Sequence, residues 1–214
     1  MRNRVDTILF DLDGCIVDTL PIWLKSFQQT FKKFHISITD AELLKIGFHR
    51  IYDHKLHIQS REEFINEVYG FYTKNFLDSP LHQNALSTLK KLKRNNFKTA
   101  LVTSSRRSVV DIFLEKQRVA QYFDYTLAWE DTKANKPDPE PLLKAIQLLK
   151  SDPERSIMIG DSDTDISAAQ AAHVTSIWYH PPQNNVFYNE DTFTVHNPDF
   201  TIHDFEELFP IINL

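Results

Sequence analysis

Carboxylates are concentrated in two short segments of the chain, residues 11–14 (DLDG) and residues 160–165 (GDSDTD). Each segment directly follows a short apolar run. Carboxylates crowded into one crevice are driven toward protonation unless a cation balances them. Mg²⁺ prefers oxygen ligands and is commonly held by one or two carboxylates, waters and phosphate oxygens. The two segments therefore predict a magnesium site, where the metal would screen the repulsion between an anionic nucleophile and a phosphate.

Two further segments supply groups that suit a phosphate, Thr103-Ser104 and Lys136-Pro137. The Lys136 ammonium is a compact positive charge for a phosphate oxygen. The Thr103 hydroxyl and the backbone N–H of Ser104 can donate hydrogen bonds to the same group. A carboxylate nucleophile, a metal, a cation and hydrogen-bond donors are the parts that transfer through an aspartyl phosphate requires. This combination predicts phosphoryl transfer with Asp11 as the nucleophile.

The elements that must position these groups are short, continuous apolar runs alternating with helical patterns. The predicted strands are 7–10, 99–102, 125–128, 157–159, 176–179 and 199–202. Helical patterns cover about 84–95, 106–117, 139–150 and 163–172, and a last one about 205–212. This alternation predicts an α/β fold, a Rossmann-like parallel sheet with helices on both faces. Ligands of such sheets bind at the carboxyl ends of the strands, where all four segments stand.

An all-helical insert is predicted after the first strand, because residues 20–80 contain no convincing strand. Apolar residues follow helical spacing from Leu20 to Phe34, and capping-box patterns begin at Thr39 and Ser60. We therefore expect a discontinuous core of residues 1–18 and 82–214 and a helical cap of residues 19–81. The polar stretch 181–197 is predicted to be a loop.

In order, spacing and strand context, the chain resembles the haloacid dehalogenase superfamily, in the branch of phosphoglycolate phosphatase and β-phosphoglucomutase. The family's four motifs are matched by residues 11–19, by Thr103, by residues 136–139 and by residues 159–165. At average amino-acid frequencies, the first motif alone would occur by chance with a probability on the order of 10⁻⁴. The helical insert stands where this branch carries a small cap domain.

The resemblance implies a role for each matched residue. Asp11 would attack phosphorus, and Asp13 would protonate the leaving oxygen and then activate water, help typically worth about 10²–10⁴ in rate. Mg²⁺ would be bound by the Asp11 carboxylate, the Asp13 backbone carbonyl and Asp161. Asp165 would hold Lys136 or metal-bound waters. The presence of Asp13 disfavours the dehalogenase and phosphonatase branches, which lack an acid there.

One segment departs from the family pattern, and a second has a role that the pattern does not decide. Residues 130–135 precede Lys136 where relatives often have glycine, and Lys133 competes with Lys136 for the phosphate role, with the motif position favouring Lys136. After the second cap helix, His49 or Arg50 would contact a second polar part of the substrate, or the segment is an ordinary solvated loop.

Composition narrows the class of partner. The net charge of −5 and the lack of a basic tract disfavour nucleic acid. The apolar run near the N-terminus is too short for a signal peptide or membrane span, and a single cysteine, Cys15, suits a reducing compartment. We therefore expect a cytoplasmic monomer or weak dimer that acts on a small phosphorylated metabolite.

The leading hypothesis is a phosphatase acting on a small phosphomonoester. One alternative is a sugar-phosphate mutase of the β-phosphoglucomutase type, which would share the core and return the phosphate to the substrate. A second is a non-catalytic phospho-accepting signalling domain. Such domains also place an Asp, a Thr or Ser and a Lys on a parallel sheet, but they lack the helical insert and the Asp-x-Asp pair.

Overall fold

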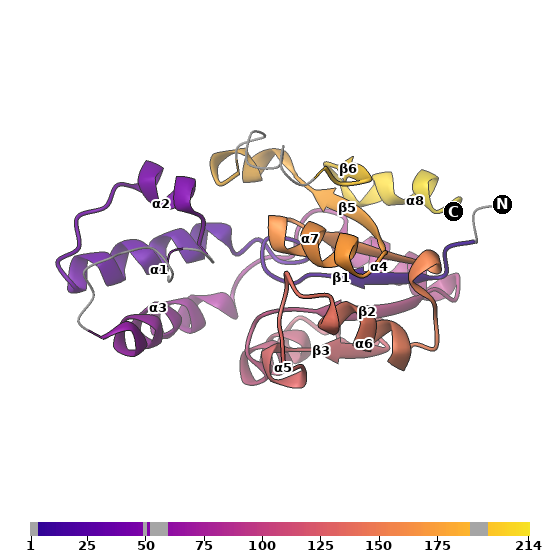
Figure 1. Ribbon diagram of the computed structural model, residues 1–214, viewed down its shortest axis with the longest axis horizontal. Coiled ribbons are helices and arrows are strands. Elements are labelled where there is room, and N and C mark those ends of the chain that lie inside the picture. Colours follow the sequence, from indigo (N-terminus) through magenta and orange to yellow (C-terminus); the bar gives the residue numbers. More distant parts are fainter. Residues whose placement is uncertain (1–3, 49–50, 52–59, 189–196) are drawn as a thin grey trace. The chain divides into compact units, whose positions relative to one another are not determined.

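A computed structural model describes residues 4–48, 51, 60–188 and 197–214 of the chain. The polypeptide folds as two compact units (Figure 1). One unit comprises Met1–Asp18 and Pro80–Leu214, and the other comprises Thr19–Ser79. The second unit is thus an insertion into the first, entered and left at neighbouring points, since the Asp18 N–H donates to the Pro80 carbonyl at 3.0 Å.

The larger unit is built on a six-stranded sheet in the order β3-β2-β1-β4-β5-β6, and all neighbouring strands are parallel. The strands are β1 Thr7–Phe10, β2 Lys98–Val102, β3 Tyr125–Leu127, β4 Ser156–Gly160, β5 Thr175–Tyr179 and β6 Phe200–Ile202. The parallel sheet predicted from the apolar runs is confirmed. Strands buried on both faces need apolar side chains at every position, which is why they read as continuous runs.

Helices cover both faces of this sheet, as predicted. They are α4 Ala85–Arg94, α5 Arg107–Lys116, α6 Glu140–Leu148, α7 Asp163–Ala171 and α8 Leu208–Ile211. Successive residues of β1 point to opposite faces. Leu9 packs in one cluster with residues of α6 and α7, whereas the Phe10 ring lies against Phe123 and Phe205, with centroids 6.3 and 6.2 Å away.

The smaller unit contains α1 Leu20–Lys33, α2 Asp40–Ile46 and α3 Arg61–Phe76, and its described residues form no strand. Its core is aromatic, with Phe27, Phe31 and Phe64 in mutual contact. Both predicted helix starts are found. The Thr39 hydroxyl accepts from the Glu42 N–H at 3.2 Å while Glu42 accepts from the Thr39 N–H at 2.8 Å, and the Ser60 hydroxyl accepts from the Glu63 N–H at 3.2 Å.

Two sequence-based expectations near the C-terminus are corrected. The stretch predicted as a loop contains a 3₁₀ helix, Pro182–Val186, and the helix predicted over 205–212 is a 3₁₀ turn, Phe205–Glu207, followed by the short α8. Pro182 suits a first helical turn, where its missing N–H costs nothing. The Asp204 side chain caps the second turn by accepting from the Glu206 N–H at 2.8 Å. Among the helices described, none has the length and apolar character needed to cross a membrane.

Candidate functional site

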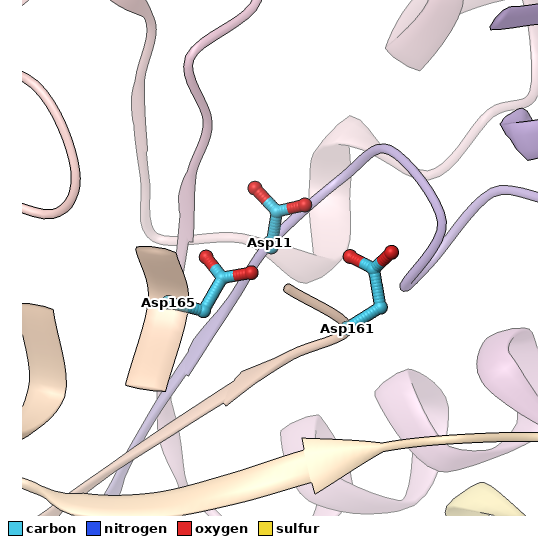
Figure 2. A group of neighbouring side chains, drawn as sticks. All are labelled: Asp11, Asp161 and Asp165. Atoms are coloured by element: carbon cyan, nitrogen blue, oxygen red, sulfur yellow. The ribbon is translucent and has the colours of Figure 1, made fainter. Parts of the chain in front are cut away.

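Three carboxylates converge at the carboxyl edge of the sheet (Figure 2). Asp11 follows β1, Asp161 follows β4, and Asp165 lies in the first turn of α7. The register places Phe10 opposite Ile159, and the Asp11 N–H continues the ladder by donating to the Ile159 carbonyl at 2.9 Å. One oxygen from each of the three carboxylates lies within 4.8 Å of the others, and all three residues are buried. Adjacent parallel strands have therefore brought both acidic segments of the sequence together.

The Lys136 ammonium lies between two of these carboxylates, Asp11 and Asp165. Its Nζ donates to Asp11 Oδ1, to Asp165 Oδ1 at 2.6 Å and to the Val102 carbonyl at 2.9 Å. Only 3% of the side chain is exposed. Three acceptors use all three donors of the ammonium. Lys133, which competes for this role in the sequence, is exposed, and its backbone N–H donates to Glu140 at 3.2 Å.

The electrostatics of this cluster show an excess of negative charge. Burial raises the pKa of Asp11 to about 7, although the Lys136 ammonium opposes the shift. Burial also raises the pKa of Asp161, and the charges of Asp11 and Asp165 raise it further. Burial alone would lower the pKa of Lys136, but Asp11 and Asp165 outweigh it and the pKa is raised. The site thus holds three buried carboxylates and one ammonium, which pairs with Asp11 and Asp165, and this imbalance suits a divalent cation with oxygen ligands.

Asp165 uses both carboxylate oxygens within the protein. Oδ1 accepts from Lys136, and Oδ2 accepts from the Ser162 N–H at 3.1 Å and the Ser162 hydroxyl at 2.6 Å, which also caps α7. The side chain lies directly on Gly160, where a Cβ atom would come within 2.2 Å of Asp165 Cγ. Glycine is therefore required at this point of β4 for Asp165 to reach Lys136. Asp161, by contrast, is the better placed of the two to bind a cation.

Asp13 and Thr103 are linked through Ser105. Asp13 Oδ2 accepts from the Ser105 hydroxyl at 2.6 Å, and Thr103 Oγ1 accepts from the Ser105 N–H at 3.0 Å. Thr103 follows β2 directly, and its own N–H donates to the Leu127 carbonyl at 2.9 Å. The loop after β2 thus carries Thr103, Ser104 and Ser105 to the same sheet edge. Sequence reasoning missed Ser105, although it stands in the same hydroxyl-rich run.

Three other residues that contact the candidate site were not predicted from the sequence, because they lie in or just before the stretch predicted as a loop. They are Trp178, Asn184 and Tyr188. Asp161 is contacted twice. The Tyr188 hydroxyl donates to Oδ2 at 2.7 Å, and the Trp178 indole N–H donates to the Asp161 backbone carbonyl at 2.9 Å. The Asn184 amide donates to the Gly14 carbonyl at 3.2 Å, in the loop that carries Asp11. No local pattern marks these residues. The two residues predicted to contact substrate, His49 and Arg50, lie outside the described residues.

A family model described as "Haloacid dehalogenase-like hydrolase" matches residues 8–179. A protein of Caldanaerobacter subterraneus subsp. tengcongensis, named "Putative pyrophosphatase PpaX", is 33% identical over 216 residues, which cover 98% of this chain and 95% of the relative.

Solved structures share the fold. A predicted phosphoglycolate phosphatase from Haemophilus somnus has a TM-score of 0.80 at 24% identity, with 99% of both chains covered. A structure described as "putative beta-phosphoglucomutase" from Thermotoga maritima has a TM-score of 0.73 at 20% identity, with 98% of this chain and 99% of the other covered. At these identities the likeness concerns the fold alone. The family match spans most of the chain, and the chain therefore belongs to the haloacid dehalogenase-like hydrolases.

Proposed function

We propose that this hydrolase is a magnesium-dependent phosphatase that acts on a small phosphomonoester, phosphoglycolate-like or sugar-phosphate-like, through an aspartyl phosphate on Asp11. The observation that carries the proposal is the buried cluster of Asp11, Asp161 and Asp165, in which Asp11 and Asp165 both accept hydrogen bonds from the buried Lys136 ammonium. A carboxylate nucleophile beside a buried ammonium, in a site with excess negative charge, suits attack on a phosphate whose charge is balanced by a metal.

The residues present fit magnesium. Asp11 and Asp161 would provide carboxylate oxygens and Asp13 its backbone carbonyl, a hard oxygen donor set without nitrogen or sulfur. The raised pKa values of Asp11 and Asp161 indicate that a nearby positive charge would stabilise both carboxylates in their ionised form. When bound, the metal supplies charge neutralisation for the phosphate and holds the Asp11 carboxylate ionised.

The protein residues account for both halves of the reaction. An Asp11 oxygen forms a bond to phosphorus while the bond to the leaving oxygen breaks, and Asp13 donates a proton to that oxygen. The positive charge of Lys136 and hydrogen bonds from the Thr103 hydroxyl and the Ser104 N–H stabilise the phosphate oxygens. Water then attacks phosphorus, Asp13 accepts its proton, and the bond between Asp11 and phosphorus breaks. Inorganic phosphate leaves, and Asp11 and Asp13 return to their starting states.

A second candidate substrate is inorganic pyrophosphate, favoured by the name of the 33% identical relative. The same chemistry applies, because the leaving group is then a phosphate oxygen that Asp13 protonates. The mutase alternative would use the same catalytic residues, Asp11, Asp13, Thr103 and Lys136. It would differ in returning the phosphate to the substrate. Membership in a hydrolase family argues against the signalling-domain alternative.

Steady-state assays test the proposal. Purified protein with Mg²⁺ is given p-nitrophenyl phosphate, phosphoglycolate, a hexose 1-phosphate and pyrophosphate, and both phosphate and isomeric sugar phosphates are measured. We expect multiple turnovers with release of phosphate. Asp11→Asn should abolish turnover, whereas Asp111→Asn, which alters a side chain 58% exposed on α5, should not.

The products separate the alternatives. An isomeric hexose phosphate without net phosphate release would establish the mutase and overturn the phosphatase. If phosphate is released from pyrophosphate alone, the substrate is that anhydride and not a phosphomonoester. Equal inactivity of wild type and Asp11→Asn across the whole panel would overturn the enzymatic proposal.

A further inference from the structure

The chain segment after β5, residues 180–188, lies beyond the residues matched by the family model, which end at 179. It nevertheless contacts both of the acidic segments. Asn184, which is fully buried, donates to the Gly14 carbonyl at 3.2 Å, and Tyr188 donates to Asp161 Oδ2 at 2.7 Å. This segment thus links the loop that carries Asp11 to the carboxylate at the end of β4.

Tyr188 is held in place by packing as well as by its hydroxyl. Its partly buried ring lies against Ile166 of α7 and Trp178 of β5. Trp178 in turn donates its indole N–H to the Asp161 backbone carbonyl at 2.9 Å. Asp161 is therefore restrained at its backbone and at one carboxylate oxygen by two aromatic residues that contact each other.

We propose that Tyr188 is a positioning residue for a metal ligand, holding Oδ2 of Asp161 so that the other oxygen binds the cation, and thereby favouring Mg²⁺ over Ca²⁺. The inference rests on the proposed role of Asp161 as a magnesium ligand. Mg²⁺ demands near-ideal octahedral geometry with short bonds, which suits one oxygen from each carboxylate. Ca²⁺ takes more ligands at longer distances and readily binds both oxygens of a carboxylate.

The Tyr188 hydroxyl is the group that would set the metal preference. Tyr188→Phe keeps the ring against Ile166 and Trp178 but removes the hydrogen bond to Asp161 Oδ2. The carboxylate then has freedom to rotate and both oxygens are open to a cation. Removal of a hydrogen bond that orients a metal ligand typically lowers metal affinity roughly 10- to 100-fold. We expect a loss of this size for Mg²⁺ and a smaller loss, or a gain, for Ca²⁺, so the preference for Mg²⁺ shrinks.

The experiment is calorimetric titration of metal-free protein with MgCl₂ and separately with CaCl₂, for wild type, Tyr188→Phe and Tyr72→Phe. Tyr72→Phe removes the hydroxyl of a fully buried tyrosine in the smaller unit and is the matched control. Tryptophan fluorescence gives a second readout, because Trp178 contacts both Tyr188 and Asp161. We expect Tyr72→Phe to match wild type in both affinities, and Tyr188→Phe to bind Mg²⁺ more weakly with a lower Mg²⁺/Ca²⁺ affinity ratio.

A folded Tyr188→Phe variant whose Mg²⁺ affinity and affinity ratio equal those of wild type would overturn the role of Tyr188 and leave the proposed function intact. If that variant does not fold, Tyr188→Leu, which also lacks the hydroxyl, is measured by the same criterion. Wild-type protein that binds neither cation would overturn the proposed metal site and this inference with it. Melting temperatures of the metal-free proteins establish which variants are folded.

Discussion

Lys136 and Asp165 lie 29 positions apart in the sequence and are joined by a hydrogen bond of 2.6 Å between Nζ and Oδ1. Their side chains are 3% and 1% exposed. Burial of two charges costs much of what their attraction provides, so such a pair adds little stability by itself. Its consequence here is positional, since Asp165 holds the ammonium against Asp11. The pair therefore makes the geometry of Asp11, the proposed nucleophile, depend on α7.

Lys136→Ala should remove activity and destabilise the fold. Three carboxylates would then share a buried site without a cation, and loss of one partner of a buried pair typically costs about 3–5 kcal/mol. The free energy of unfolding, measured with urea in metal-free buffer, tests this alongside phosphate release. Lys133→Ala, which alters an exposed side chain three positions earlier, should leave both quantities unchanged. The interpretation fails if the two variants behave alike.

Gly160→Ala should disturb the site although glycine carries no side chain. The added methyl would lie 2.2 Å from Asp165 Cγ, so Asp165 must move away from Lys136. Overpacking of this kind costs about 1–3 kcal/mol in unfolding free energy, and we expect a marked fall in kcat as well. Gly70→Ala is the matched control, because nothing lies within 4 Å of its added methyl in α3. That variant should gain about 0.5–1 kcal/mol by its helix preference and keep full activity.

Ser105→Ala should lower kcat without unfolding the protein. The Ser105 hydroxyl donates to Asp13 Oδ2 at 2.6 Å, and an intramolecular hydrogen bond is typically worth about 0.5–1.5 kcal/mol, which corresponds to roughly a 2- to 10-fold change in rate. We expect the loss in kcat, with KM nearly constant, because the role proposed for Asp13 is proton transfer. Ser104→Ala keeps its backbone N–H and should retain activity. Equal effects of the two substitutions on kcat would contradict the assignment.

The stability of the metal-free protein should fall as pH rises from about 4 to about 7, as far as Asp11 determines it. Burial raises the pKa of Asp11 to about 7 in the folded protein, from 3.8. Within that window the folded state keeps a proton that the unfolded state releases, so raising the pH favours unfolding. The Asn side chain in Asp11→Asn has no carboxyl group and does not titrate, so this variant lacks the effect. Its unfolding free energy relative to wild type should therefore increase between about pH 4 and about pH 7, a difference that urea unfolding in EDTA measures. Parallel pH curves for the two proteins would refute the raised pKa.

Local patterns in the chain were enough to predict the strands and most of the helices. A strand buried on both faces must be apolar throughout, and a helix start needs a side chain that accepts from free N–H groups, so both leave marks over a few residues. The two acidic segments could also be placed at one edge of the sheet. Parallel strands all have their carboxyl ends at that edge, whichever strands are neighbours.

The partners of the acidic residues were decided only in three dimensions. Ser105 contacts Asp13 across 92 positions, and Tyr188 contacts Asp161 across 27. A tyrosine in a polar stretch looks the same in sequence whether or not its hydroxyl meets a carboxylate. Such contacts depend on which strands adjoin and where the chain runs after β5, and no residue spacing encodes that. The chain alone thus predicts which carboxylates act in the proposed chemistry, and the packed structure determines which neighbours hold them.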